Sequence, residues 1–396
     1  MSVTGIVDLS ALGREFVADP FAFYARLREQ GPLHRANSPL QGDIWLVVGY
    51  EEARAVLADP RLSKDWRTVV PDTQEIPSIS ANMLESDVPV HTRLRKLVAR
   101  EFTSRRIEAL RPRVQEITDR LLDEMAPRTS ADLIEALAFP LPMTVICELL
   151  GVPDLDRETF STLSRKAIGE SDGYDDGAAA TDLLSRYLAE LIEDKRRGGP
   201  QPDLLSALIR ARDDDGDQLS AAELVGMAFL LLVAGHETTV NLIANGVLAL
   251  LRHPDQLAAL RADPGLMPGA IEEMLRYDGP LENATFRFTR EPTEIAGRLL
   301  PAGQLIAVVL AAGDRDPGRF PSPDTFDIRR ETQGHLAFGH GIHYCLGAPL
   351  ARMEGQIALT SLLARCPGLT LDATPDELTW RSGHLMRGLQ RLPVRF

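Results

Sequence analysis

The chain has 396 residues, of which 44% are hydrophobic and 25% are charged, a balance typical of a globular protein rather than a disordered one. The formal net charge of −14 argues against non-specific binding to nucleic acid, whose phosphates would be repelled by most of the surface. Three cysteines exclude a disulfide framework and fit a reducing compartment. The first residues lack a secretion signal, and the longest apolar run, residues 227–235, is shorter than the roughly 20 residues that span a membrane. We therefore predict a cytoplasmic protein without membrane contact.

The spacing of apolar residues predicts a mainly helical chain with smaller β-sheets, an α+β fold class. The expected helices, in chain order, are residues 20–30, 50–58, 107–125, 140–150, 179–195, 221–252, 269–277 and 348–364. A strand is expected at residues 44–48, and further strands after residue 281. The glycine and proline turn at 198–202 is too short to separate independent domains. We predict one domain over 1–396, with a β-rich part at about 30–80 and 281–335 plus C-terminal strands, and an α-rich part at about 91–277 and 348–366.

A short acidic turn precedes the longest predicted helix. Its Gly216 resembles the glycine of a calcium loop, but the first and twelfth positions would then be Ala211 and Ala222, which cannot bind calcium. A simpler interpretation is a polar turn followed by a capping box, in which Ser220 and Glu223 open the helix.

The predicted helix 221–252 contains no proline and would be about 48 Å long, enough to cross a domain. Its apolar middle is interrupted by Gly235 and by two threonines that can bond carbonyl groups one turn back. Ala234 and Thr238 share a face, so the small alanine leaves room for a ligand beside the Thr238 hydroxyl, and Glu237 places an acid next to it. A buried helix with a satisfied polar kink explains the same residues.

A ten-residue segment, 338–347, places three glycines around Cys345 and runs directly into a helix. The glycines allow the backbone to approach a flat ligand closely, and amides at a helix start stabilise a thiolate, so a metal-bound thiolate is favoured. Zinc, with His335, His340 and His343 nearby, and an inert buried cysteine are the alternatives. Neither of the other two cysteines has such a glycine-rich approach; they are Cys147 and Cys366.

This segment resembles the haem loop of the cytochrome P450 superfamily, especially its soluble bacterial members. The resemblance extends from residues 61–63 to residues 387–389. It implies a triangular haem-thiolate monooxygenase fold with the long helix over the haem, and haem b whose iron is held by Cys345.

The resemblance also implies roles for residues far from the cysteine. Glu237 and Thr238 would be the catalytic acid and alcohol that deliver protons for cleavage of O2. Glu273 and Arg276 would form a buried structural pair with a later arginine, either Arg319 or Arg329. The residues expected to bind the haem propionates are His91, Arg95, Arg287 and His343.

By resemblance to actinobacterial members, the enzyme would insert one atom of O2, by hydroxylation or epoxidation, into a lipophilic polyketide, macrolide, steroid or similar secondary metabolite. NAD(P)H electrons would arrive through a ferredoxin reductase and an acidic ferredoxin, and the protein would be a monomer. Residues 91–113 hold eight basic residues against two acids, so a ferredoxin could dock there, although ordinary solvated helix faces explain the same pattern. The docking residues would be Arg93, Lys96, Arg105 and Arg106.

The substrate pocket is expected to be mostly apolar, with Glu282 offering a carboxylate to an amino or hydroxyl group unless it faces outward. A segment at 160–174 would contribute as well. The other expected pocket residues are Leu84, Val88, Leu231, Ala234, Leu281, Asn283, Ala284, Leu385 and Met386. A haem-binding sensor, an isomerase on the same fold, and a fold that has lost haem are the competing functions.

Overall fold

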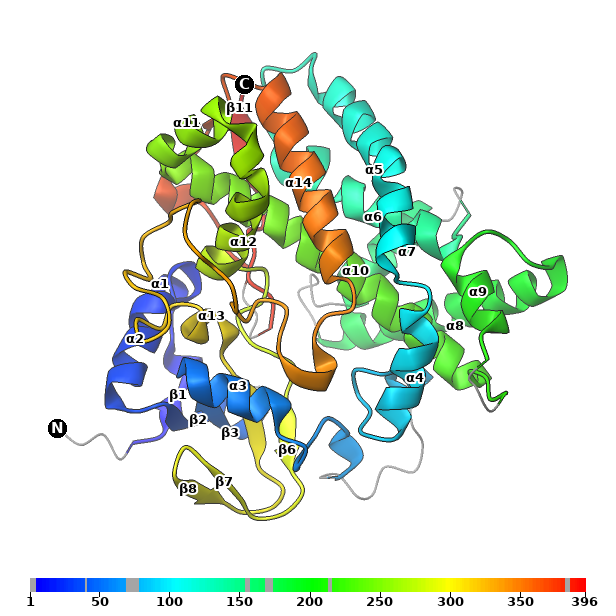
Figure 1. The fold of residues 1–396 in the computed structure, drawn as a ribbon, viewed down its shortest axis with the longest axis vertical. Helices are drawn as coiled ribbons and strands as arrows, with labels where there is room; N and C mark the ends of the chain where they lie inside the picture. Colours follow the sequence, from blue (N-terminus) through cyan, green and yellow to red (C-terminus); the bar gives the residue numbers. More distant parts are fainter. Residues whose placement is uncertain are drawn as a thin grey trace.

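The computed structural model describes residues 5–39, 41–68, 78–153, 157–167, 174–212, 216–381 and 385–396. Helices dominate this part of the chain, as the sequence predicts (Figure 1). The helices are α1 (Arg14–Ala18), α2 (Phe21–Gln30), α3 (Tyr50–Ala58), α4 (Val90–Ala99), α5 (Ser104–Met125), α6 (Pro140–Leu150), α7 (Arg157–Ala167), α8 (Tyr174–Gly198), α9 (Leu204–Arg210), α10 (Ala221–Arg252), α11 (Pro254–Ala262), α12 (Met267–Asp278), α13 (Leu310–Gly313) and α14 (Ala348–Arg365).

The long helix α10 is the centre of the helical region and contacts α6, α8, α12 and α14. Its predicted capping box is confirmed: the Glu223 amide donates to Ser220 Oγ at 3.2 Å, and the Ser220 amide donates to Glu223 Oε2 at 2.8 Å. By length and composition α10 could cross a membrane, but 67% of its most apolar window is buried inside the protein. It therefore has the character of the core helix of a globular protein.

The strands are short. Most of them come from residues 7–63 and 287–308 and lie on one side of the molecule (Figure 1). The largest sheet has the order β1-β2-β3-β9-β6-β4, in which β2 pairs with β3 antiparallel and β3 pairs with β9 in parallel. The strands are β1 (Val7–Asp8), β2 (Leu33–Ser38), β3 (Gly42–Val47), β4 (Leu62–Ser63), β5 (Ser130–Asp132), β6 (Arg287–Thr289), β7 (Thr293–Ile295), β8 (Arg298–Leu300), β9 (Leu305–Val308), β10 (Thr370–Leu371) and β11 (Pro393–Arg395).

The predicted elements agree closely with the structure. Residues 50–58, 140–150 and 221–252 begin and end where α3, α6 and α10 do. A proline opens α6 and a left-handed glycine follows it, and a capping box opens α10. The largest hydrophobic cluster surrounds α10, and two smaller clusters lie against the main sheet. The sheet therefore supports one side of the molecule and the helices the other.

The loop before α4 is pressed onto α10 near its first turns. A Cβ atom at Gly226 would lie 2.5 Å from the Ala81 carbonyl oxygen, so glycine is needed for this approach. The Met83 amide also donates to the sulfur of Met227 at 3.4 Å. These contacts bring the loop at residues 78–90 over the same helix that carries Thr238.

Candidate functional site

The loop around Cys345 is shaped by its glycines. The Cys345 amide donates to the Phe338 carbonyl oxygen at 2.9 Å and closes the loop on itself. Gly341 has a φ of +76°, and a Cβ atom there would lie 2.8 Å from the carbonyl oxygen of Leu57 in α3. The loop is thus wedged between α3 and the start of α14, and its shape requires glycine.

The thiol of Cys345 is exposed in front of the loop, whereas Cys147 and Cys366 are buried. The protein around it still limits hydration, so burial raises the pKa of the Cys345 thiol, while the amides of Gly347 and Ala348 lower it by donating to the sulfur. Arg95 also lowers that pKa. An exposed cysteine whose sulfur accepts hydrogen bonds from two amides is suited to bind a metal as a thiolate.

The middle of α10 faces open space on one side. Ala234 is exposed and Thr238 is half-buried, although most of the helix on either side is buried. The Thr238 hydroxyl donates to the Ala234 carbonyl oxygen at 2.9 Å, as predicted. Helix α14, which starts directly after the Cys345 loop, packs along α10 (Figure 1).

Cations and imidazoles gather beside the Cys345 loop. His91 and His343 have ring centroids 4.3 Å apart, and neither ring nitrogen of buried His91 has a hydrogen-bond partner among the described residues. Burial and the nearby positive charges lower the pKa of His343 to about 3, and burial lowers that of Arg287 to about 10. Arg95 lies at the edge of this group, with Nη2 donating to the Tyr344 carbonyl oxygen at 2.6 Å.

Lys64 joins this cationic cluster, which we define as Lys64, His91, Arg95, Arg287 and His343. Its Nζ donates to Thr285 Oγ1 at 2.5 Å and to the Phe286 carbonyl oxygen at 2.9 Å. Burial, followed by the charge of Arg287, lowers its pKa well below the usual value. Like charges and unpartnered nitrogens held together in this way fit a dianionic ligand, such as the two carboxylates at the edge of a haem. Lys64 is not among the residues predicted to bind the haem propionates, although it directly follows residues 61–63, where the resemblance to the family begins.

The predicted structural pair is present and fully buried. Arg276 donates to both carboxylate oxygens of Glu273, at 2.7 and 2.8 Å, and Arg276 also donates to the carbonyl oxygen of Asp314 at 2.9 Å. The later arginine is Arg330, whose Nε lies 3.3 Å from Glu273 Oε1.

Both arginines proposed for that third position were wrong. Arg319 instead donates to the Gln333 carbonyl oxygen, and the Arg329 amide donates to Asp327. Sequence position alone could not choose among arginines separated by a few residues in a stretch without regular structure, because its backbone decides which side chain turns inward.

The two ends of the predicted pocket wall meet in the structure. Leu281 forms a β-bridge with Met386, and the Glu282 amide donates to the Leu385 carbonyl oxygen at 3.0 Å. Leu231 is buried on α10, while Val88 is 60% exposed. Residues 168–173 and the side chains of Phe160 and Tyr174 lie outside the described residues.

The prediction that Glu282 offers a carboxylate to a ligand is wrong. The Glu282 side chain is buried and accepts a hydrogen bond from the hydroxyl of Tyr24 in α2. Burial raises the pKa of both groups, so this is a polar contact inside the protein. The Glu282 side chain points toward α2 rather than toward the pocket, and the local sequence does not reveal this direction.

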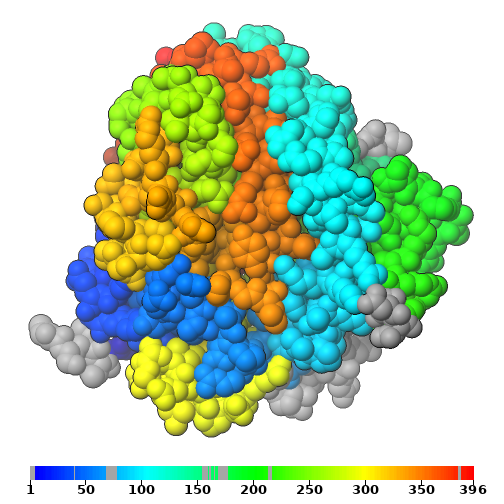
Figure 2. All heavy atoms as spheres, in the orientation of Figure 1, coloured from blue at the N-terminus to red at the C-terminus, as the bar shows by residue number. Residues whose placement is uncertain are grey.

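Several basic residues at 91–113 are paired with acids, some within this segment and some from other parts of the chain. Arg93 pairs with Glu223 and with Asp217, and Arg106 pairs with Glu101. The other ion pairs include Arg111 with Glu108 and Arg113 with Glu148. Lys96 and Arg105 are exposed. Helix α5 lies beside α14 on the face shown in Figure 2. The excess positive charge of residues 91–113 is therefore smaller than their sequence suggests.

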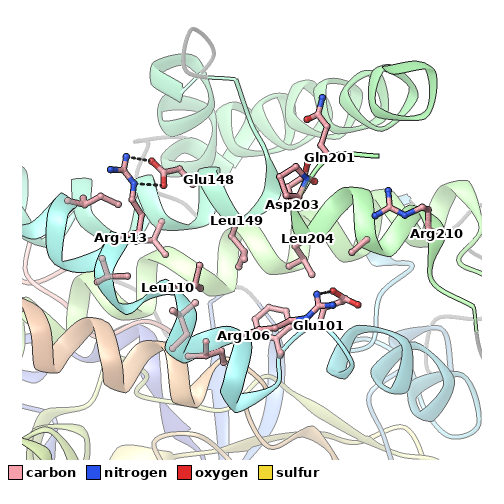
Figure 3. Close-up of a pocket in the computed structure, with 18 residues that line it drawn as sticks. Glu101, Arg106, Leu110, Arg113, Glu148, Leu149, Gln201, Asp203, Leu204 and Arg210 are labelled. Atoms are coloured by element: carbon pink, nitrogen blue, oxygen red, sulfur yellow. Dashed lines mark hydrogen bonds and ion pairs between the residues drawn. The ribbon is translucent and has the colours of Figure 1, made fainter. Parts of the chain in front are cut away.

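A separate cavity of about 550 Å³ lies between α5, α6 and α9 (Figure 3). Its floor is apolar, with Leu110, Leu149 and Leu204, and the ion pair of Arg113 and Glu148 stands at its rim. None of the predicted catalytic or cofactor-binding residues lines it.

The sequence pattern of the cytochrome P450 family matches residues 29–166, 174–264 and 265–387. The chain is 59% identical to cytochrome P450 monooxygenase PikC of Streptomyces venezuelae, over 99% of this chain and 94% of PikC. It is 45% identical to 6-deoxyerythronolide B hydroxylase of Saccharopolyspora erythraea, over 99% of each chain. The solved structure of tirandamycin C-bound P450 monooxygenase TamI is similar, with a TM-score of 0.89 and 48% identity over 98% of this chain and 99% of TamI.

The chain therefore belongs to the cytochrome P450 family. It is a bacterial P450 monooxygenase, and its mainly helical fold with small sheets and a long central helix confirms the predicted fold class. The family implies haem b and O2 as the cofactor and co-substrate.

Proposed function

We propose that this P450 hydroxylates or epoxidises a bulky lipophilic secondary metabolite of the polyketide or macrolide type, with Cys345 as the axial ligand of the haem iron. The observation that carries the haem assignment is the cationic cluster beside the exposed thiol. Its unpartnered His91 nitrogens lie against His343, two residues before Cys345. A cluster of this composition would be costly without an anion.

The residues of the chain divide the work as follows. Cys345 binds the iron, and the cationic cluster neutralises the propionates and fixes the orientation of the haem. Haem, when bound, would supply the activation of O2, and a thiolate ligand would favour that chemistry. Thr238 would offer a hydroxyl on the partly exposed side of α10, and Glu237 would deliver protons toward it.

The substrate class is supported by similarity and by the character of the pocket wall. A relative aligned along almost its whole length is named for hydroxylating 6-deoxyerythronolide B, and TamI holds tirandamycin C. Leu84, Leu231, Ala234, Leu281 and Met386 supply an apolar surface, which suits a large apolar skeleton with few polar groups. Glu282 is buried against Tyr24 and offers no carboxylate to an amino group of the substrate.

Electrons would come from NAD(P)H through an acidic ferredoxin that docks near Lys96 and Arg105. Two of the four basic residues first assigned to this surface, Arg93 and Arg106, already pair with acids of the same chain. Lys96 and Arg105 are exposed, and their positive charge would attract an acidic partner.

The thiolate ligand is tested by the spectrum of the reduced protein with carbon monoxide. We expect a strongly red-shifted Soret band in the parent protein and in Cys147→Ser and Cys366→Ser, and its loss in Cys345→Ser. A parent protein without that band would contradict the haem-thiolate assignment. A band without any oxygen-dependent product would favour a sensor or an isomerase.

The substrate class is tested by titrating the ferric protein with 6-deoxyerythronolide B and with tirandamycin C. Displacement of water from the iron by a bound substrate shifts the spin state and moves the Soret band. We expect a saturable shift with at least one compound, and its loss in Leu231→Trp, which would fill the pocket wall. If neither compound shifts the band, the proposed substrate class is wrong.

A further inference from the structure

The carboxylate of Glu237 is held by a cation from the C-terminal end of the chain. Glu237 is buried in the middle of α10, and Nη1 of Arg381 donates to its Oε1. The Arg381 side chain is itself mostly buried, with 19% of its surface exposed. A guanidinium in a poorly hydrated setting strongly favours the anionic form of its partner carboxyl.

The backbone around Arg381 is fixed against α10. Residues 380 and 389 form a β-bridge, and the Arg381 amide donates to the Gly388 carbonyl oxygen at 2.9 Å. Gly388 lies directly on Asn241, one turn beyond Glu237, where a Cβ atom would come within 2.1 Å of the Asn241 Oδ1. This close contact, which only glycine permits, brings the C-terminal hairpin onto α10 and delivers Arg381 to Glu237.

A histidine lies on the other side of the same carboxylate. His236 Nε2 lies 3.8 Å from Glu237 Oε2, and the ring is fully buried. Nδ1 of His236 donates to the Leu232 carbonyl oxygen at 2.9 Å, which leaves Nε2 to interact with Ser164 Oγ of α7 at 3.4 Å. Glu237 is thus placed between a group from the C-terminal hairpin and a ring braced by α7.

Other groups of the described residues pack near this part of α10. From α14, Glu354 reaches α10 at Thr239, two residues along the helix from Glu237. The segment before α6 contributes Phe139, edge-on to the His236 ring at 6.0 Å, and α6 itself packs Ile146 against Gly235. Arg381 is the arginine that the structure places on this carboxylate.

We propose that Arg381 is a positioning residue that fixes the place and the charge of Glu237, and thereby sets the pH range in which Glu237 can deliver protons toward Thr238. The proposal rests on the acid role of Glu237 given under Proposed function. Leu385 and Met386 of the predicted pocket wall lie in the same C-terminal segment as Arg381. This segment would therefore both contact the substrate and position Glu237.

The proposal has a physical consequence that separates it from a purely structural role. Without the guanidinium, a buried Glu237 would lose its counter-charge, and its titration would move toward neutral pH. A proton would then be taken up on folding, and stability would fall as pH rises through that range. Replacing Glu237 by glutamine in the same protein would abolish this pH dependence.

The experiment compares urea unfolding midpoints of the haem-loaded protein from about pH 5 to about pH 8. We expect Arg381→Met to become progressively less stable than Arg381→Met/Glu237→Gln as pH rises. We also expect Arg381→Lys, which keeps the charge, to differ from Arg381→Lys/Glu237→Gln by a constant amount. A matched control is Arg391→Met, since Arg391 is an exposed arginine in the same part of the chain that bonds Asp132 at 3.1 Å. If the difference in unfolding midpoint between Arg381→Met and Arg381→Met/Glu237→Gln does not change with pH, the proposal is overturned.

Peroxide formation distinguishes this inference from the acid role of Glu237. Hydrogen peroxide released per NADH consumed is measured without substrate and with 6-deoxyerythronolide B, across the same pH range. We expect Glu237→Gln to release more peroxide than the parent protein at every pH. We expect the pH profile of Arg381→Met to move upward by about one unit, with Arg381→Lys close to the parent. An unchanged yield in Glu237→Gln would remove Glu237 from proton delivery, whereas an unmoved profile in Arg381→Met alone would overturn the role of Arg381.

Discussion

The charge state of Lys64 is expected to depend on bound haem. Its ammonium is buried, bonded to Thr285 and Phe286, and placed near Arg287. Burial and, after it, the charge of Arg287 lower the pKa of Lys64, and a carboxylate of haem would favour its charged form again. Lys64 is therefore expected to contribute to haem retention as well as to local packing.

We predict that Lys64→Met releases haem faster than the parent protein. Loss of one charge-assisted hydrogen bond corresponds to roughly a tenfold increase in the dissociation rate. The rate is measured by transfer of haem to an excess of apomyoglobin. Lys96→Met serves as the control, because Lys96 is exposed and outside the cationic cluster. Equal rates for the two variants would show that Lys64 does not contact the cofactor.

Thr238 permits a second prediction at this scale. Thr238→Ala removes the hydroxyl that faces the open side of α10, so more of the electrons supplied by NADH should leave as hydrogen peroxide. Thr144→Ala is a close control, because its hydroxyl makes the same kind of bond, to the Pro140 carbonyl oxygen at 2.7 Å, on a different helix. Unchanged coupling in Thr238→Ala would count against its catalytic role.

At the scale of an element, α10 and the loop at residues 78–90 are joined by a contact that tolerates no side chain. A Cβ atom at Gly226 would lie 2.5 Å from the Ala81 carbonyl oxygen and 2.6 Å from that of Ser78. Both neighbours are backbone atoms, so the loop would have to move away from the helix. The same loop leads to His91 and its cluster, which links the packing of α10 to the cofactor site.

We predict that Gly226→Ala destabilises the protein by about 1–3 kcal/mol, the usual cost of overpacking, despite the higher helix propensity of alanine. Gly198→Ala at the end of α8 provides the control, since nothing lies within 4 Å of its added Cβ atom. Urea unfolding of both variants measures the difference. Equal midpoints would mean that the loop yields without cost.

The face formed by α4 and α5 supports a prediction about electron transfer. Replacing Lys96 and Arg105 by glutamine should slow reduction by an acidic ferredoxin and flatten the dependence of the rate on ionic strength. Arg111→Gln should have little effect, because Arg111 is already paired with Glu108 at 2.8 Å. If the double variant keeps the rate and salt dependence of the parent, the ferredoxin docks elsewhere.

At the scale of the whole molecule, Glu354 makes stability depend on pH. It is fully buried in α14, and burial raises its pKa to about 8, an effect partly opposed by a hydrogen bond from Thr239. The unfolded chain would ionise this carboxyl near its ordinary value of 4.5, so the folded protein binds the extra proton between the two values. Stability should therefore fall as pH rises from about 4.5 to about 8.

We predict that Glu354→Gln removes this fall, so that the variant gains stability relative to the parent as pH rises. The slope should approach about 1.4 kcal/mol per pH unit at most. Unfolding midpoints from about pH 5 to about pH 8 provide the measurement. Glu108→Gln, on an exposed carboxylate, should run parallel to the parent. Parallel curves for Glu354→Gln as well would place its pKa near the ordinary value.

Local sequence predicted what depends on local forces. Periodicity and capping located α10, and the glycines around Cys345 indicated a close ligand approach. Interactions between distant segments were not accessible in the same way. A lysine after a short strand suggests a surface residue, so the sequence around Lys64 did not indicate a role at the cofactor site. The partner of Glu282 is Tyr24, 258 residues away, and the local sequence could not indicate that contact. The choice of Arg330 over its neighbours likewise depends on an irregular backbone.

The cationic cluster has a consequence for how the protein accumulates in a cell. Until haem arrives, the buried cations and unpartnered His91 nitrogens of this cluster should oppose the final packing of the β-rich part against α4, and haem binding would supply the missing stability by mass action. Nascent chains should thus partition between degradation and maturation according to the supply of haem. Iron-starved cells would then contain less of the polypeptide, and feeding a haem precursor would restore its abundance without any change in transcription.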